Sequence, residues 1–117
     1  MIFEKIRLYC LAKPGVEECF PFDESTLVFK VLGKMFLITD LNNTTAITVK
    51  CDSEKAIELR ERYSEIQPGY HTNKKYWNTI ALNGNLSDDF LIEMIHHSYE
   101  EVVKKMPKHS QQKISTL

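Results

Sequence analysis

Residues 26–41 read TLVFKVLGKMFLITDL, and they predict the β-hairpin around which the fold is built. In the first half, every second residue is apolar and faces the same way, as in a strand that buries one face. The alternating apolar residues are Leu27, Phe29 and Val31. Leu32-Gly33-Lys34 then provides a tight turn, and residues 35–41 return as a second strand.

Further elements are predicted on both sides of this hairpin. They are a helix over residues 2–13, an irregular connection over 15–25, a third strand over 45–51, a helix over 53–63, two short strands over 69–73 and 76–82, and a helix over 88–105. Asp52 and Ser87 are suited to cap the two later helices, because a side-chain oxygen can accept from the free N–H groups of a first turn. Pro107 ends the last helix, and residues 108–117 are expected to form a basic, frayed tail.

The order of these elements predicts the fold class. Strands joined by short turns pair antiparallel, and an antiparallel sheet commonly buries one face. We therefore expect an α+β fold, with an antiparallel sheet of about five strands and the helices packed on one face. A length of 117 residues is typical of one domain, which we assign to residues 1–107.

Composition limits the function classes. The formal net charge is −1, whereas nucleic-acid-binding domains usually carry a strong basic excess, so any such contact has to depend on local patches. The cysteines Cys10, Cys19 and Cys51 have no C-x-x-C spacing, which indicates reduced thiols in a cytoplasmic protein. No stretch reaches the ~18 apolar residues of a membrane helix, so we expect no membrane partner. A monomer is favoured over an obligate oligomer.

Four segments carry the most distinctive sequence. They are FPFDESTLVFKVLGKMFLITDL, ITVKCDSEKAIELRERY, IQPGYHTNKKYWNTI and LSDDFLIEMIHHSYEEVVKKMP. Over about residues 13–107 the chain resembles the MmcQ/YjbR family of small bacterial proteins. The resemblance implies a frataxin-like (CyaY-like) fold and a DNA-binding role that rests on two protruding hairpins, called a double wing. In this sequence the wings are Leu27–Asp40, turning at Gly33-Lys34, and Tyr70–Leu82, turning at Lys74-Lys75.

Residues 68–80, PGYHTNKKYWNTI, gather cations and aromatic residues without an acid. In one interpretation they contact DNA, because lysines at a turn reach phosphates and an aromatic ring can stack on an exposed base. The candidate contacts are His71, Asn73, Lys74, Lys75 and Tyr76, with Lys34 from the first wing. Lysines near the end of the chain could extend this surface. They are Lys104, Lys105, Lys108 and Lys113.

In the other interpretation the same stretch is structural. Trp77 anchors the core with its N–H satisfied, while Lys74 and Lys75 keep an exposed turn in water. Both interpretations can hold for different residues, with Trp77 buried and the lysines outside. The rival to DNA binding is a protein- or peptide-interaction module of the same fold. It would use a sheet edge or an apolar groove beside Phe20-Pro21-Phe22-Asp23.

No residue pattern points to catalysis or metal binding. The chain has no G-x-S-x-G motif and no Gly-rich phosphate loop. His96 and His97 are adjacent on a predicted helix, so their side chains diverge by ~100° and cannot readily share a metal ion. We therefore expect a non-enzymatic binding protein with no cofactor, no metal site and no catalytic residue, and with DNA as the first partner.

Overall fold

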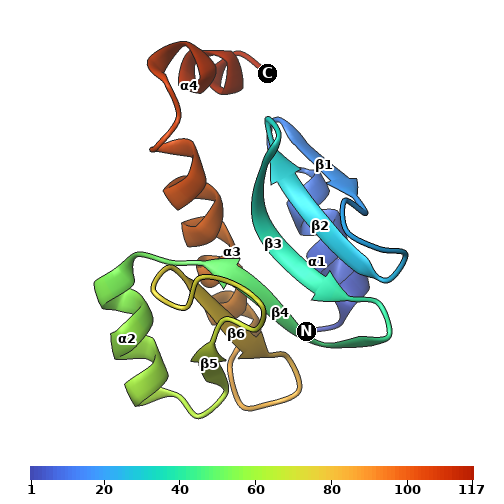
Figure 1. Ribbon diagram of the computed structural model, residues 1–117, viewed down its shortest axis with the longest axis vertical. Coiled ribbons are helices and arrows are strands. Elements are labelled where there is room, and N and C mark those ends of the chain that lie inside the picture. Colours follow the sequence, from blue (N-terminus) through green and yellow to red (C-terminus); the bar gives the residue numbers. More distant parts are fainter.

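A six-stranded antiparallel sheet organises the computed structural model, which describes residues 1–117 (Figure 1). The strands are β1 (Val16–Cys19), β2 (Thr26–Val31), β3 (Lys34–Asp40), β4 (Asn43–Lys50), β5 (Ile66–Pro68) and β6 (Trp77–Ala81). They lie in the order β1-β2-β3-β4-β6-β5, and every neighbouring pair is antiparallel. The helices are α1 (Phe3–Leu11), α2 (Ser53–Arg62), α3 (Asp88–Val103) and α4 (Lys108–Ser115). The predicted α+β class is confirmed, with six strands where about five were expected.

The predicted β2–β3 hairpin is present and turns on Leu32 and Gly33. Val31 pairs with Lys34, so the loop has two residues, and their φ angles are 45° and 85°. Two positive φ angles match the twist of the flanking strands, but a leucine adopts this conformation only at a cost. Leu32 is held there by packing, because its half-buried side chain contacts the core.

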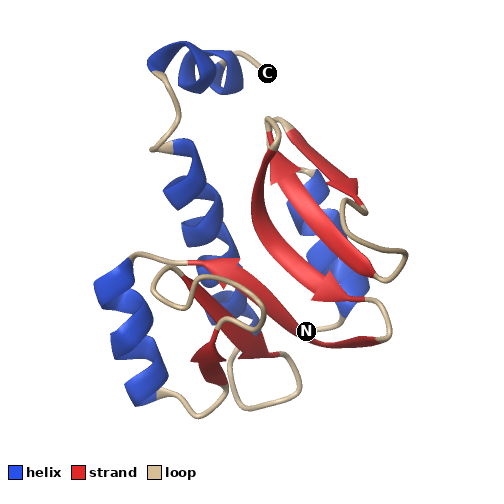
Figure 2. Cartoon of the chain, in the orientation of Figure 1, coloured by secondary structure: helices blue, strands red, loops and turns tan.

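Three helices cover one face of the sheet, as predicted (Figure 2). α1 contacts β1, α2 contacts β5 and β6, and α3 contacts β2, β3 and β4. Leu27, Phe29 and Val31 point to this face and are buried in the main core, in agreement with the alternation in the sequence. The opposite face carries no helix of this layer and is called the open face below.

The additional strand is β1. The sequence predicts an irregular connection over 15–25, whereas the structure pairs Val16 with Val31 and Cys19 with Val28. Glu18 turns toward α1 and accepts from Nε of Arg7 at 2.7 Å. A strand of four residues with two adjacent acids has too short an alternation to be recognised, and the free edge of β2 determines its pairing.

The second predicted hairpin has different limits. The sequence predicts strands over 69–73 and 76–82, whereas β5 precedes the first of these ranges and β6 lies within the second. Pro68 belongs to β5, and a proline is tolerated in a strand at the sheet edge, where no neighbour needs its missing N–H. Residues 69–76 form a loop instead, in which His71 has a φ of 58° that no strand permits.

The three predicted helices are present, and each ends within two residues of its expected limits. The carboxylate of Asp52 accepts from the N–H of Lys55 at 3.2 Å, and the hydroxyl of Ser87 accepts from the N–H of Phe90 at 3.1 Å. Both predicted caps are therefore confirmed. None of the helices combines the length and the apolar character that a bilayer crossing requires.

The expectation of a frayed tail over residues 108–117 is wrong, because most of this segment forms α4. Ile114 is only 9% exposed and belongs to the main core. Nε2 of Gln111 donates to the carbonyl of Met106 at 2.9 Å, which ties α4 to the end of α3. α4 lies close to the β2–β3 turn in Figure 1. This contact joins distant parts of the chain, so the polar composition of the tail did not reveal it.

Replacement of Ile114 by alanine tests the docking of α4. Ile114→Ala should lower the free energy of unfolding by about 2 kcal/mol, because it leaves a cavity where α4 meets the core. Urea unfolding followed by circular dichroism measures this as a lower midpoint with an unchanged slope. Leu117→Ala is the control, because that side chain is 67% exposed and its loss should lie within about 0.5 kcal/mol of neutral. Equal midpoints for the two variants would contradict the prediction.

Candidate nucleic-acid interface

β3 and β4 separate at one end, and a serine on α3 lies in the opening. The strands pair as far as Leu37 and Val49 and then diverge toward the start of β3 (Figure 1). At the next position, the hydroxyl of Ser98 accepts from the N–H of Lys50 at 2.8 Å and donates to the carbonyl of Phe36. A hydroxyl bridge therefore replaces one bond of the ladder. It holds the strands apart while both backbone groups stay paired.

A bulge in β3 lies at the point where the strand bends away. The β2–β3 register shifts between Phe29 and Lys30, and Phe36 is the extra residue in β3. The ring of Phe36 is fully buried and meets the ring of Tyr99 edge-on, with the centroids 5.6 Å apart. Both the backbone and the side chain of this residue are thus anchored on α3.

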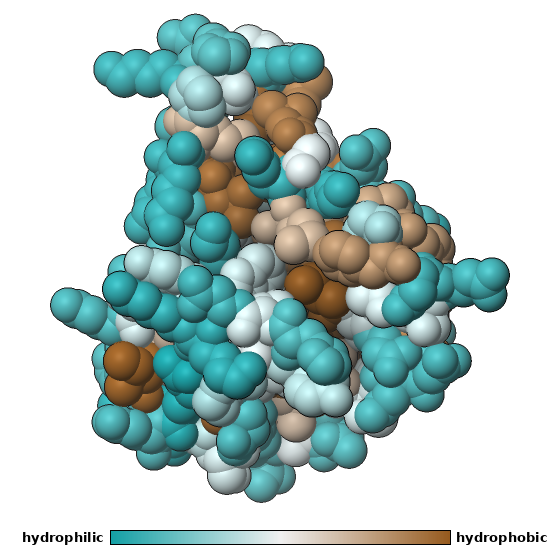
Figure 3. Space-filling view, viewed as in Figure 1, coloured by the Kyte–Doolittle hydropathy of each residue, from teal (hydrophilic) through white to brown (hydrophobic).

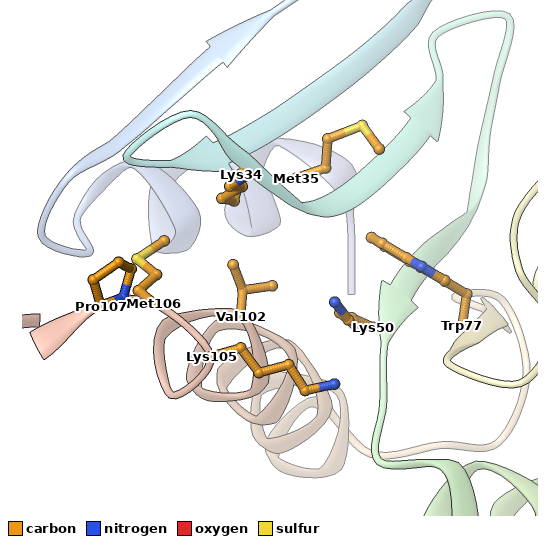
Figure 4. Close-up of a pocket in the computed structure, with 8 residues that line it drawn as sticks. All are labelled: Lys34, Met35, Lys50, Trp77, Val102, Lys105, Met106 and Pro107. Atoms are coloured by element: carbon orange, nitrogen blue, oxygen red, sulfur yellow. The ribbon is translucent and has the colours of Figure 1, made fainter. Parts of the chain in front are cut away.

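The separation opens a cleft of about 490 Å³ between β3, β4, β6 and the end of α3 (Figure 4). Its lining residues are Lys34, Met35, Lys50, Trp77, Val102, Lys105, Met106 and Pro107. We call it the lysine cleft. Figure 3 shows apolar side chains in the region between α4 and the sheet, with hydrophilic side chains around them. The cleft therefore combines an apolar lining with cationic groups.

Positive charge gathers in the lysine cleft because its three lysines come from three different elements. None of Lys34, Lys50 and Lys105 forms an ion pair. Partial burial lowers the pKa of Lys50, and the charges of Lys105 and Lys34 lower it further, against the opposite effect of Glu101. The carboxylate of Glu101 is itself paired with Lys104. The cleft therefore keeps a positive charge that the protein does not neutralise.

Tyr76 joins the lysine cleft to the loop over residues 69–76. Nζ of Lys105 lies 4.8 Å from the centroid of its ring, and Nζ of Lys75 lies 5.4 Å from it. These are cation–π distances. The carbonyl of Tyr76 accepts from the N–H of Cys51 at 2.8 Å, which fixes the loop to the end of β4. The positive surface thus continues from the cleft to Lys75.

Trp77 is buried, as predicted, but it lies outside the main core. It pairs with Lys50 across β4 and β6, so its side chain lies on the open face and lines the lysine cleft (Figure 4). The residue is 9% exposed. The expectation that its indole N–H is satisfied stays a prediction.

The predicted contacts in the loop differ in their availability. Lys74 and Lys75 are both exposed, as predicted. The ammonium of Lys74, however, donates to the carbonyl of Gly69 at 3.0 Å and so closes the loop. Oδ1 of Asn73 accepts from the N–H of Lys75 at 3.0 Å and stabilises the turn. His71 is exposed and contacts the ring of the preceding tyrosine at a tilt of 52°, with the centroids 4.0 Å apart.

Of the six predicted contact residues, Lys34, Lys75 and Tyr76 gather at or beside the lysine cleft. Among the lysines near the end of the chain, Lys105 joins them. Lys50 lines the cleft but is not among the contacts predicted from the sequence. Its position on the polar side of a predicted strand was visible, but the residues that make it part of a site come from distant segments.

The comparison with known proteins agrees with this architecture. A protein-family model named YjbR matches residues 11–101. The chain belongs to the YjbR family. The protein YjbR of Escherichia coli K12 is 31% identical over 109 residues, which cover 92% of each chain. YbdF of Escherichia coli O157:H7 is 32% identical over 114 residues, which cover 97% of this chain and 93% of YbdF. Both are described as uncharacterized proteins, so the family assignment does not supply an activity.

Solved structures show the same fold. The crystal structure of the Deinococcus radiodurans protein DR2400, described as a DUF419 domain, matches with a TM-score of 0.90 and 37% identity. The match covers 97% of this chain and 88% of DR2400. A structure from Pseudomonas syringae matches with a TM-score of 0.72 over 86% of this chain and 98% of its own, at 23% identity. The YjbR family membership inferred from the sequence is thus confirmed.

The Ser98 bridge can be tested through stability. Ser98→Ala should lower the free energy of unfolding by about 1–3 kcal/mol, because a buried N–H and a buried carbonyl lose their partner. Alanine is the better helix former, which offsets up to about 0.5 kcal/mol of this loss. Urea unfolding is the measurement. Ser64→Ala removes a hydroxyl from an exposed serine and should be nearly neutral. The bridge would be unimportant if both variants unfolded at the same midpoint.

His97 holds the start of α2 at the end of β4. Its Nε2 accepts from the N–H of Asp52 at 3.2 Å, so this nitrogen carries no proton. Partial burial lowers the pKa of His97, and the charges of Lys55 and Lys104 lower it further, against the opposing effects of Glu101 and Asp52. Protonation of the ring would break the hydrogen bond to the backbone.

The free energy of unfolding should therefore fall as the pH decreases below about 6.5, the usual histidine value. In that range the unfolded chain binds more protons than the native protein, so acidification favours unfolding. Urea unfolding at several pH values between about 7.5 and 5.5 measures how steeply the free energy of unfolding depends on pH. His97→Gln keeps a hydrogen-bond acceptor that does not titrate. The remaining pH dependence of the free energy of unfolding should then come from other groups only. His109→Gln, at an exposed position on α4, should keep the wild-type slope. A wild-type slope in His97→Gln would disprove the role of His97.

Proposed function

We propose that this member of the YjbR family is a non-enzymatic, cytoplasmic DNA-binding protein that contacts phosphates through the lysines in and beside the lysine cleft. They are Lys34, Lys50, Lys75 and Lys105. The observation that carries the proposal is their convergence: four lysines from β3, β4, the loop over residues 69–76 and the end of α3 gather around the cleft and Tyr76. Most protein–DNA hydrogen bonds go to phosphate and sugar, and lysine serves such contacts as a point charge.

The two hairpins support the same proposal. The β2–β3 hairpin supplies Lys34 immediately after its turn, and the β5–β6 hairpin supplies Lys75 from its loop. Loop residues Tyr70 and His71 offer exposed rings that an unpaired base could stack on. The three cysteines are free thiols, which is in keeping with a reducing compartment.

Binding is expected to be weak. The formal net charge of −1 means that acidic surface elsewhere opposes the approach of DNA. Three or four phosphate contacts release few counterions, so affinity should lie at best in the ~10⁻⁴–10⁻⁶ M range of non-specific complexes at physiological salt. Specificity for a sequence requires base contacts, which this surface supplies only through the loop.

A salt titration tests the proposal. The logarithm of the association constant for a labelled duplex, plotted against the logarithm of the salt concentration, should have a slope of about −3 to −4. The double variant Lys75→Gln/Lys105→Gln should flatten this slope by up to ~2 units, because each lost contact removes about 0.9 released counterion. Lys5→Gln/Arg62→Gln removes two exposed cations from α1 and α2 and is the control. No binding at low salt, or an unchanged slope in the first double variant, would refute the proposal.

A protein-interaction role is the second candidate, favoured by an exposed apolar loop. Phe20 and Phe22 are 49% and 64% exposed. The loop is adjacent to the β3–β4 turn, where the N–H of Leu41 donates to the carbonyl of Ser25 at 2.8 Å. Phe20–Phe22 carries no cation, so a protein that acts only through this loop would show no DNA binding at any salt concentration. The same titration therefore separates the two functions.

A further inference from the structure

We propose that the lysine cleft binds a terminal phosphate monoester carried by a nucleoside, either a free nucleotide or the 5′-phosphorylated end of a strand. Binding of a 5′-phosphorylated strand end, called the strand-end form below, rests on the proposed DNA-binding function. A free nucleotide would occupy the same cleft even in a protein that does not bind DNA. This goes beyond contact with the phosphates along a duplex, because it assigns one cavity to one chemical group.

The charge of the cleft favours a monoester over a diester. Lys34, Lys50 and Lys105 line it, and none of them has a carboxylate partner. Glu101, the acidic group that acts on Lys50, is paired with Lys104. A phosphate monoester carries about −1.5 to −2 charges near pH 7 and offers three acceptor oxygens, whereas a diester within a strand carries only one charge. Three unpaired ammonium groups complement the monoester better.

The size and lining of the cleft favour an inserted small group. A volume of about 490 Å³ lies within the ~300–1,000 Å³ range of small-molecule sites. Met35, Trp77, Val102 and Met106 supply apolar surface beside the lysines, which suits a nucleoside attached to the phosphate. A double helix presents its phosphates on a broad convex surface, so it can meet the exposed lysines at the rim of the cleft but does not fill the space between them.

Trp77 adds a directional group. Its ring lines the cleft beside Lys50, with which it pairs across β4 and β6 (Figure 4). An indole N–H is a hydrogen-bond donor only, so at this position it is suited to donate to an anionic oxygen of a ligand. Because Trp77 is the only tryptophan of the chain, its fluorescence reports directly on the occupancy of the cleft.

The first experiment titrates the full chain with adenosine 5′-monophosphate, adenosine and inorganic phosphate, and follows Trp77 fluorescence with calorimetry as a second readout. The monophosphate should bind at least about tenfold more tightly than adenosine, because charge-assisted contacts to the phosphate dominate. Lys50→Met keeps the apolar stem without the charge and should weaken this binding by about tenfold or more. Lys5→Met on α1 should bind as the wild type does, and thermal unfolding of both variants confirms that they are folded. Equal affinity for adenosine and the monophosphate, or wild-type affinity in Lys50→Met, would overturn the proposal.

The second experiment compares single-stranded oligonucleotides that differ only in a 5′-phosphate or a 5′-hydroxyl. Tighter binding of the phosphorylated strand, lost in Lys50→Met, supports the strand-end form. Equal binding of the two strands overturns that form. If the monophosphate binds but no DNA binds at any salt concentration, the cleft is a nucleotide site and the proposed DNA-binding function fails. If duplex DNA binds with the expected salt slope but the monophosphate does not, the assignment of the cleft fails and the DNA-binding function stands.

Discussion

One hydroxyl group, that of Ser98, determines where the sheet stops pairing and where the lysine cleft begins. It stands between the N–H of Lys50 and the carbonyl of Phe36, the two groups that the next bond of the β3–β4 ladder would join. Val102 follows Ser98 on the same face of α3, because residues four positions apart align on a helix, and Lys105 lies in the turn that follows α3. The group that separates the strands and a residue that lines the cleft therefore belong to one helix face. The shape of the site depends on how α3 packs in the core rather than on the lysines.

The parts of the fold that the sequence predicts correctly are those with local signals. The β2–β3 hairpin has a clear alternation and a glycine in its turn, and α3 has a capping serine and a long apolar stripe. Two elements were missed because they depend on distant partners. β1 is a four-residue strand that pairs with the free edge of β2, and α4 is held by Ile114 in a core built from earlier segments. The strand predicted over 69–73 lies at Ile66–Pro68 instead, because an edge strand tolerates a proline that would disrupt a central strand.

The candidate site shows the same division between local and distant signals. Lys75 stands in a visible cluster of cations and aromatic rings, so composition alone points to it. Lys50 becomes a site residue only through its bridge to α3 and its pairing with Trp77. Conversely, Lys74 and Asn73 look available in the sequence, but the loop uses both for its own hydrogen bonds. Local composition predicts which residue types gather, whereas the hydrogen-bond requirements of the loop decide which of them remain free for a ligand.

The charge of Lys50 in the cleft opposes folding, and this links the site to the stability of the protein. Partial burial and the charges of Lys105 and Lys34 lower the pKa of Lys50, so the folded protein holds that proton less firmly than the unfolded chain does. Solvent screens part of the repulsion, because these side chains keep access to water. A bound anion would offset the repulsion, favour the charged form of Lys50 and stabilise only the folded state. Because Ser98 and Phe36 hold the cleft open from the core side, its lysines stay gathered around a space that an anion can enter.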